Sequence, residues 1–373
     1  MSQDIAYLPR LRFQELLDTL KDAGYRCVGP HVKDGTILFD TVDKVDSLPQ
    51  GMTEEQGPGF YRIKSSSNER YFSWANGPQA LKPFLFAAEE KLWSAGRDAE
   101  NHIHFTPVAP EAEHIAIIGV RGCDLAALRL QDQHFMEGEY VDPYYAARRQ
   151  GIFLVAVNCS HPADTCFCVS TGDGPNASEG YDLVLSELDD GFIVEYGSER
   201  GRFMHERLNM QGASAEQKEK ADEELNSARN SQHRHLPPGN LRDVLFENLA
   251  HPRWGDVAER CLSCSNCTSV CPTCFCHSEA ERPGLDGSNS EHIRQWDSCF
   301  TPGHSYIHGM TIRADTHLRY RQWLTHKLGS WHDQYGRSGC VGCGRCIAWC
   351  PAGIDIVEEV TAICSGKGMG NEA

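Results

Sequence analysis

The sequence contains no hydrophobic run long enough to cross a bilayer, which takes about 20 apolar residues. Its first residues, MSQDIAYLPRLRFQELL, lack the basic segment and the following apolar segment of a secretory signal, and no twin-arginine signal is present. We therefore expect a cytoplasmic protein.

The usual motifs of nucleotide-binding and hydrolytic enzymes are also missing. No GxGxxG segment stands between a predicted strand and a predicted helix, and no Walker, HExxH or GxSxG segment occurs. We therefore predict no nucleotide site and no hydrolytic machinery, and we assign no catalytic residue and no binding residue for an organic cofactor.

Positive charge is scarce, with 35 Lys and Arg residues against 52 Asp and Glu residues and a net charge of −17. A chain this acidic repels phosphate backbones, so we expect no nucleic-acid partner. Solubility is the simplest explanation of the acidity, and a docking role is the alternative. The chain of 373 residues is long enough for two or three domains.

Cysteine, in contrast, is abundant, with 17 residues. Disulfides do not persist in a reducing cytoplasm, and an odd number of cysteines argues against a complete set of disulfides. Clustered cysteines in this setting indicate metal binding.

Two segments, which begin at Cys261 and Cys340, share the spacing Cys-x2-Cys-x2-Cys-x3-Cys-Pro of bacterial two-cluster ferredoxins. In this pattern three closely spaced thiolates hold one cluster, and the fourth cysteine ligates the other cluster. The pattern predicts two [4Fe-4S] clusters, with Cys261, Cys264, Cys267 and Cys350 for cluster one and Cys340, Cys343, Cys346 and Cys271 for cluster two. Gly342 and Gly344 allow the second loop a close approach. Structural zinc is the alternative, but zinc sites usually pair two CxxC units.

The long segment 272–339 separates the two motifs, and its part HSYIHGMTIRADTHLRYRQWLTHKLGSWH is predicted to be mostly helical. We therefore expect an α-helical ferredoxin domain rather than the small β-containing kind. This segment also concentrates positive side chains, namely Arg313, Arg319, Arg321 and Lys327. They either pair with local carboxylates and cluster charge, or form a docking face for an acidic partner or a flavin subunit.

The N-terminal half shows alternating helix and strand patterns. We predict helices over 11–24, 79–96, 124–135 and 144–150, strands over 36–39, 114–120 and 151–157, and a strand pair over 182–196. Buried strands separated by helices favour parallel pairing. The sequence thus predicts an α+β protein, with an α/β domain and a mainly parallel sheet at 1–200, a helical linker at 201–250, and the α-helical ferredoxin domain at 251–373.

Four further cysteines follow the two buried strands of this half, namely Cys123, Cys159, Cys166 and Cys168. If the strands are parallel neighbours, these thiols meet at the carboxyl edge of the sheet, where sites form in α/β proteins. Four thiolates could hold a third iron–sulfur cluster. Buried free thiols are the alternative.

Cys274, Cys276 and Cys299 form a looser set that could ligate a further site or pack against cluster one. Three thiols with no certain fourth ligand are a weak indication of metal. Cys27 and Cys364 stand alone, and we interpret them as structural or incidental.

Several blocks together resemble a known family. HIAIIGVRGCDLAAL, DPYYAARR, VNCSHPADTCFC, CLSCSNCTSVCPTCFC, RQWDSCF and GCVGCGRCIAWCPAGID look like the β subunit of cytoplasmic NAD(P)-linked nickel–iron hydrogenases, also called sulfhydrogenases. The same architecture is found in the iron–sulfur subunit of anaerobic sulfite reductase. The resemblance covers about residues 110–360.

The resemblance implies an iron–sulfur electron-transfer subunit. Such a subunit would lie between a flavin-containing subunit that reacts with NAD(P)H and the small subunit of a hydrogenase, which leads to the nickel–iron large subunit. The corresponding sulfite reductase subunit is the alternative within this class. A cluster-based redox sensor is disfavoured, because the acidic chain shows no DNA-binding segment.

Overall fold

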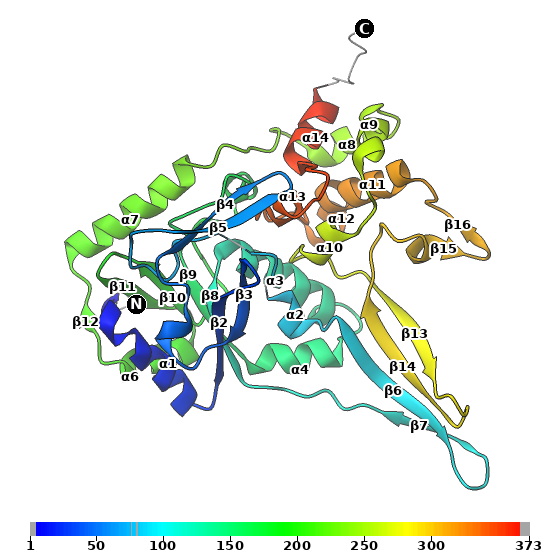
Figure 1. Ribbon diagram of the computed structural model, residues 1–373, viewed down its shortest axis with the longest axis horizontal. Helices are drawn as coiled ribbons and strands as arrows, with labels where there is room; N and C mark the ends of the chain where they lie inside the picture. Colours follow the sequence, from blue (N-terminus) through cyan, green and yellow to red (C-terminus); the bar gives the residue numbers. More distant parts are fainter. Residues whose placement is uncertain (1–4, 76, 80, 366–373) are drawn as a thin grey trace.

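The computed structural model describes residues 5–75, 77–79 and 81–365 (Figure 1). No helix within these residues is both long and apolar enough to span a membrane.

An eight-stranded mixed sheet forms the centre of the N-terminal part. Its strands lie in the order β12 (Gln211–Gly212), β1 (Ala6–Pro9), β11 (Gly191–Tyr196), β10 (Leu183–Glu187), β9 (Ile152–Val157), β8 (Ile115–Val120), β2 (Arg26–Lys33) and β3 (Thr36–Thr41). The central pairings β10–β9, β9–β8 and β8–β2 are parallel, and the outer pairings are antiparallel. The expected parallel strands therefore form the middle of the sheet.

Helices cover both faces of this sheet. The helices and short turns of this part are η1 (Arg10–Arg12), α1 (Phe13–Asp22), η2 (Val45–Ser47), α2 (Lys82–Leu85), α3 (Gly122–Met136), α4 (Pro143–Gly151), α5 (Cys168–Thr171), α6 (Glu199–Arg207) and α7 (Ala215–Asn230). Ile118 of β8 packs in one core with Leu16 of α1, and its neighbour Ile117 packs in another with Leu128 of α3. Strands β8 and β9 are apolar throughout because both of their faces are buried.

The C-terminal part is mainly helical, as expected. It contains α8 (Leu241–Glu247), α9 (Arg253–Arg260), α10 (Asn266–Ser269), η3 (Gly303–Ser305), the short pair β15 (Tyr306–Ile307) and β16 (Met310–Thr311), α11 (Thr316–Thr325), the π-helical turn η4 (His326–Ser330), α12 (Trp331–Tyr335), α13 (Arg345–Ala348) and α14 (Ile356–Cys364). Trp254, Trp323 and Val360 lie in its core. The buried carboxylate of Glu359 pairs there with Arg253 at 2.5 Å and Arg260 at 2.6 Å.

A four-stranded arm joins the two parts and projects from the rest of the chain (Figure 1). Its order is β13 (His277–Pro283), β14 (Asn289–Trp296), β6 (Glu89–Arg97) and β7 (Ile103–Pro107). The helix predicted over 79–96 is therefore wrong, because only the four residues of α2 are helical and β6 follows. Strand β6 is fixed by pairing with the distant β14, where Trp93 stacks on His292 with ring centroids 4.5 Å apart.

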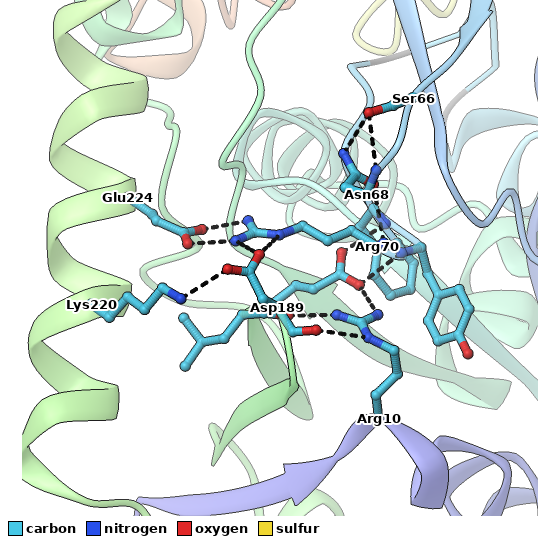
Figure 2. Close-up of polar contacts among 11 residues, drawn as sticks. Arg10, Ser66, Asn68, Arg70, Asp189, Lys220 and Glu224 are labelled. Atoms are coloured by element: carbon cyan, nitrogen blue, oxygen red, sulfur yellow. Dashed lines mark hydrogen bonds and ion pairs between the residues drawn. The ribbon is translucent and has the colours of Figure 1, made fainter.

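The polar helix α7 is fastened to the sheet by ion pairs (Figure 2). The Arg70 guanidinium lies 2.6 Å from Glu224 of α7 and 2.7 Å from Asp189 in the turn after β10, and Lys220 of α7 lies 2.9 Å from Asp189. The division into 1–200, 201–250 and 251–373 stays a prediction. Strands β13 and β14 pair with β6 across it.

A last hairpin, β4 (Met52–Gly57) with β5 (Phe60–Ser65), reaches from the N-terminal part to the helical part. The Gly59 N–H donates to the Ile347 carbonyl of α13 at 3.0 Å. Gly59 has a φ of +71°, and a Cβ atom there would lie 2.9 Å from the Cys350 carbonyl oxygen. The hairpin tip thus packs closely against the end of the second cysteine motif.

Candidate metal centres

The first cysteine-lined hollow lies in the helical part. Its wall contains all four cysteines predicted for cluster one, namely Cys261, Cys264, Cys267 and Cys350. Cys346 of the second motif also lines it, and Phe300, Tyr320, Trp323, Ile354 and Ile356 make the rest of its wall apolar. Cys264 is the exposed member of the set. The predicted cysteines are therefore brought together around one dry hollow with a single solvent-facing edge.

The loop that carries the first three cysteines is locally strained. Ser263 and Ser265 have φ values of +50° and +69°, in the left-handed region that costs a non-glycine residue about 1–2 kcal/mol. The Ser265 carbonyl then accepts the Thr268 hydroxyl at 2.8 Å as α10 begins. These turns bring successive cysteines to the same side of the loop, which is the arrangement that one cluster requires.

Burial makes these thiols poor acids when no metal is bound. The pKa of Cys267 lies well above its usual value, first because of burial and then because of the neighbouring thiols of Cys299 and Cys261. The pKa of Cys261 is raised for the same first reason. Thiolates crowded in a dry site need a positive partner, and an iron core supplies one. The donor set thus fits a cluster.

The second set gathers around Cys346, although its members come from two separated motifs. The pKa of Cys346 is raised by burial and then by Cys340, Cys343 and Cys271. Burial first, with Cys343 and Cys271 as further causes, raises the pKa of Cys340 to about 12, while Lys327 acts in the opposite direction. The four cysteines predicted for cluster two therefore lie together.

Cys271 differs from the other thiols of this set. The Cys274 thiol donates a hydrogen bond to it, and this bond, with help from Lys327, lowers the pKa of Cys271 well below its usual value. The Thr273 hydroxyl lies 3.2 Å from the Cys271 sulfur. The tetrapeptide TCFC at 273–276 thus starts inside the second set, which the spacing alone did not predict.

A third hollow lies at the carboxyl edge of the central parallel strands. It is lined by Cys123, Cys159, Cys166 and Cys168, together with Arg121 and Cys343. Cys123 is the second residue of α3, which follows β8, and Cys159 follows the parallel neighbour β9. The four thiols predicted for a third site are therefore brought together, and a cysteine of the second motif joins them.

The third hollow is packed directly against the second ferredoxin motif. The Phe167 N–H donates to the Gly342 carbonyl at 2.8 Å. A Cβ atom on Gly342 would lie 2.5 Å from the Cys168 Cα, and one on Gly344 would lie 2.4 Å from the Thr165 carbonyl oxygen. Only glycine allows this approach. The close approach expected of these glycines is thus made to the loop 165–168.

The remaining cysteines are placed less decisively. The pKa of Cys299 is raised to about 12 by burial and then by Cys276, and the Cys276 sulfur is hydrogen-bonded to His304. Cys299 also influences Cys267 of the first set. The looser set therefore lies beside both cluster sites. Cys27, whose thiol is 3.7 Å from the Leu17 carbonyl oxygen, and Cys364 pack in hydrophobic cores.

Among the residues that the structure describes, no three His, Cys, Asp or Glu side chains converge closely enough to hold one metal ion. Tetrahedral zinc keeps four sulfurs at about 2.3 Å from one centre. A four-iron cluster is wider and holds its thiolates further apart, so the relevant feature of each hollow is the set of sulfurs that line it.

Buried cations accompany the sulfur sites, and sequence reasoning missed most of them. Arg345 of α13 pairs with Asp124 of α3 at 2.8 Å, with both side chains almost fully buried between the second and third sites. Of the positive residues of segment 272–339, Arg319 and Lys327 are buried rather than surface groups. The signal available in the sequence was the apolar surroundings of the lysine, in LTHKLGSW.

Comparison with known proteins agrees with these sites. The family model of a 4Fe-4S dicluster domain matches residues 260–354. The chain is 29% identical over 357 residues to sulfhydrogenase 2 subunit beta of Pyrococcus furiosus, and the match covers 95% of this chain and 96% of that protein. No solved structure matches the chain.

These matches confirm the resemblance predicted from the sequence. The chain carries a 4Fe-4S dicluster domain, and its similarity to a hydrogenase β subunit extends over nearly its whole length. It is therefore an iron–sulfur protein with a role in electron transfer.

Proposed function

We propose that this chain is the electron-relay subunit of a cytoplasmic nickel–iron hydrogenase. It would carry electrons through [4Fe-4S] clusters between a flavin-containing subunit that reacts with NAD(P)H and the hydrogenase small subunit. The observation that carries the proposal is the continuity of its three cysteine-lined hollows. Cys346 lines the first hollow and belongs to the second set, and Cys343 belongs to the second set and lines the third hollow.

Each proposed site has four thiolates of its own. Cluster one is assigned to Cys261, Cys264, Cys267 and Cys350, cluster two to Cys340, Cys343, Cys346 and Cys271, and cluster three to Cys123, Cys159, Cys166 and Cys168. A bound [4Fe-4S] cluster takes up and releases one electron at a time. The protein's part is to hold these centres in a row and to keep water away from them, which the apolar walls of Trp323 and Ile356 do at the first site.

The two ends of the row differ in their access to partners. At the first site the exposed Cys264 faces solvent beside Leu262, whose side chain is 68% exposed. At the third site Gly122 lines both the hollow and a neighbouring cavity of about 680 Å³ that also contains Asp173 and Asn176. These are the two places where a protein partner can come near a cluster.

The proposal is tested on the chain purified under anaerobic conditions together with its copurifying subunits. We expect about twelve iron atoms and about twelve acid-labile sulfides per chain for three clusters, against about eight of each for two. Hydrogen-dependent reduction of NAD(P)⁺ should require the chain. Zinc without labile sulfide would contradict the cluster assignment, and full cluster content in a complex that lacks hydrogenase subunits would contradict the choice of partner.

A further inference from the structure

Lys327 is a buried lysine in the π-helical turn η4, between α11 and α12. Its ammonium group donates to the Thr273 hydroxyl at 2.8 Å and to the Gly339 carbonyl at 3.3 Å. Its own carbonyl accepts the Gly339 N–H at 2.8 Å, which fixes the backbone at the same point. The ammonium is therefore held in one place beside the first residue of the 273–276 tetrapeptide and the residue before Cys340.

These neutral partners do not balance the buried charge. Removing an ammonium from water is costly unless a negative group compensates for it. After burial, the strongest influences on the pKa of Lys327 are Cys271, Cys274 and Cys340, and together they raise it above its usual value. The compensating groups are thus sulfurs, and two of the three belong to the set proposed for cluster two.

Thr273 connects the ammonium to the nearest of these sulfurs. Its hydroxyl lies 2.7 Å from the Gly339 carbonyl oxygen and 3.2 Å from the Cys271 sulfur. Once Cys271 is an iron-bound thiolate it can only accept, so the Thr273 proton can turn to the sulfur while Lys327 donates to Gly339. The trio then places one positive charge and one hydrogen-bond donor next to a single ligand.

We infer that Lys327 sets the reduction potential of cluster two by presenting a permanent positive charge to its Cys271 and Cys340 side. The inference rests on the proposed function, because it requires a cluster at this site. A four-iron cluster with thiolate ligands is anionic and becomes more negative on reduction, so a buried cation stabilises the reduced form. Cluster two is therefore the member of the row that holds an electron more firmly than its ligands alone would allow.

Redox titration of the full cluster-loaded chain, followed by electron paramagnetic resonance, tests this role. In Lys327→Met the midpoint potential of cluster two should fall. The ratio of reduced to oxidised cluster two at the wild-type midpoint should drop at least tenfold, which is about 59 mV for a one-electron couple. Lys327→Arg keeps the charge and should restore most of the potential. The potential of cluster one should change little in either variant.

Two further variants separate the charge from its other effects. Lys220→Met removes the same charge from α7, where the ammonium pairs with Asp189 far from this site (Figure 2), and should leave the potential unchanged. Lys327→Gln keeps a donor for Thr273 and Gly339 but no charge, and should behave like the methionine variant. A wild-type potential in Lys327→Gln would overturn the inference.

The remaining outcomes are also decisive. If both neutral variants lose cluster two while the arginine variant keeps it, Lys327 serves cluster assembly and the tuning role is wrong. Iron and acid-labile sulfide contents below about eight per wild-type chain would contradict the proposed function itself. The metal count thus distinguishes the failure of the function from the failure of the inference.

Discussion

At the scale of single residues, burial separates the cysteines less well than their neighbours do. Cys27 and Cys168 are both buried, and burial raises the pKa of both, to about 11 and about 12. Cys27 lies among the aliphatic side chains of the sheet core, whereas Cys168 shares a hollow with other thiols and accepts a hydrogen bond from Gln232 at 3.3 Å. A structural thiol and a ligand are therefore distinguished by the company of other sulfurs.

This difference gives a direct test of the third site. Cys168→Ala should lower the iron content by about four atoms per chain, because removal of one of four thiolates empties a cluster site. Cys27→Ala is the matched control, since it removes an equally buried thiol and should leave the iron content unchanged. Iron content and acid-labile sulfide are measured on anaerobically purified protein. Unchanged iron in Cys168→Ala would make the third set a group of structural thiols.

The first site offers a test at its exposed edge. Cys264→Ser exchanges a soft thiolate for a weak ligand while it disturbs little packing, because Cys264 is exposed. We expect loss or conversion of cluster one and loss of electron transfer to the partner subunit, with the fold retained by circular dichroism. Cys364→Ser, in α14, should preserve both the cluster and the transfer. Undiminished transfer in Cys264→Ser would contradict the relay role.

At the scale of elements, α7 shows how a polar helix is kept in place without a hydrophobic face. Arg70, whose side chain is 13% exposed, binds Glu224 and Asp189 with its two edges (Figure 2). Lys220 and Arg70 together lower the pKa of Asp189 to about 2 from an ordinary value of 3.8. Because the folded pKa is the lower one, this stabilisation is complete above about pH 4 and is lost as the pH falls toward 2.

Arg70→Met should therefore release α7 at neutral pH. We expect a loss of about 1–3 kcal/mol in the free energy of unfolding, as for charged hydrogen bonds in partly buried places, and faster proteolysis within 215–230. Arg202→Met is the control, because Arg202 also binds two carboxylates but does so on the exposed face of α6, and it should cost less than about 1 kcal/mol. Equal effects of the two variants would show that α7 is held by other contacts.

The elements also show what could be predicted from the sequence. The apolar runs at 114–120 and 151–157 gave buried strands because local pattern and tertiary burial agree there, and their parallel pairing correctly predicted the meeting of Cys123 with Cys159. Segment 89–97 was wrongly predicted as helix because its partner β14 lies far along the chain. The cation beside Cys271 was hidden for a similar reason, since a spacing pattern carries no information on which distant lysine packs there.

At the scale of the whole molecule, the α/β part and the ferredoxin part meet through backbone rather than through long side chains. The loop 165–168 lies on Gly342 and Gly344, and the buried pair of Arg345 and Asp124 ties α13 to α3 behind it. A tight joint of this kind fixes the separation of the second and third sites. Electron transfer between them depends on that separation, so the joint is as important to a relay as the ligands are.

Gly344→Ala tests this joint. The new Cβ atom would lie 2.4 Å from the Thr165 carbonyl oxygen, so the loop and the motif must move apart. We expect a loss of about 1–3 kcal/mol in the free energy of unfolding and a weaker magnetic interaction between the reduced clusters two and three. Denaturant unfolding and electron paramagnetic resonance of the fully reduced chain measure these two effects.

Gly336→Ala is the control for backbone strain alone. Gly336 has a φ of +73°, almost the same as the +72° of Gly344, but a Cβ atom there meets nothing within 4 Å. Both variants carry the cost of a left-handed alanine, about 1 kcal/mol. Only Gly344→Ala should also alter the interaction between clusters, because only there does the new atom press on the loop that carries Cys166 and Cys168. An unchanged interaction in Gly344→Ala would mean that the two sites are not held together by this contact.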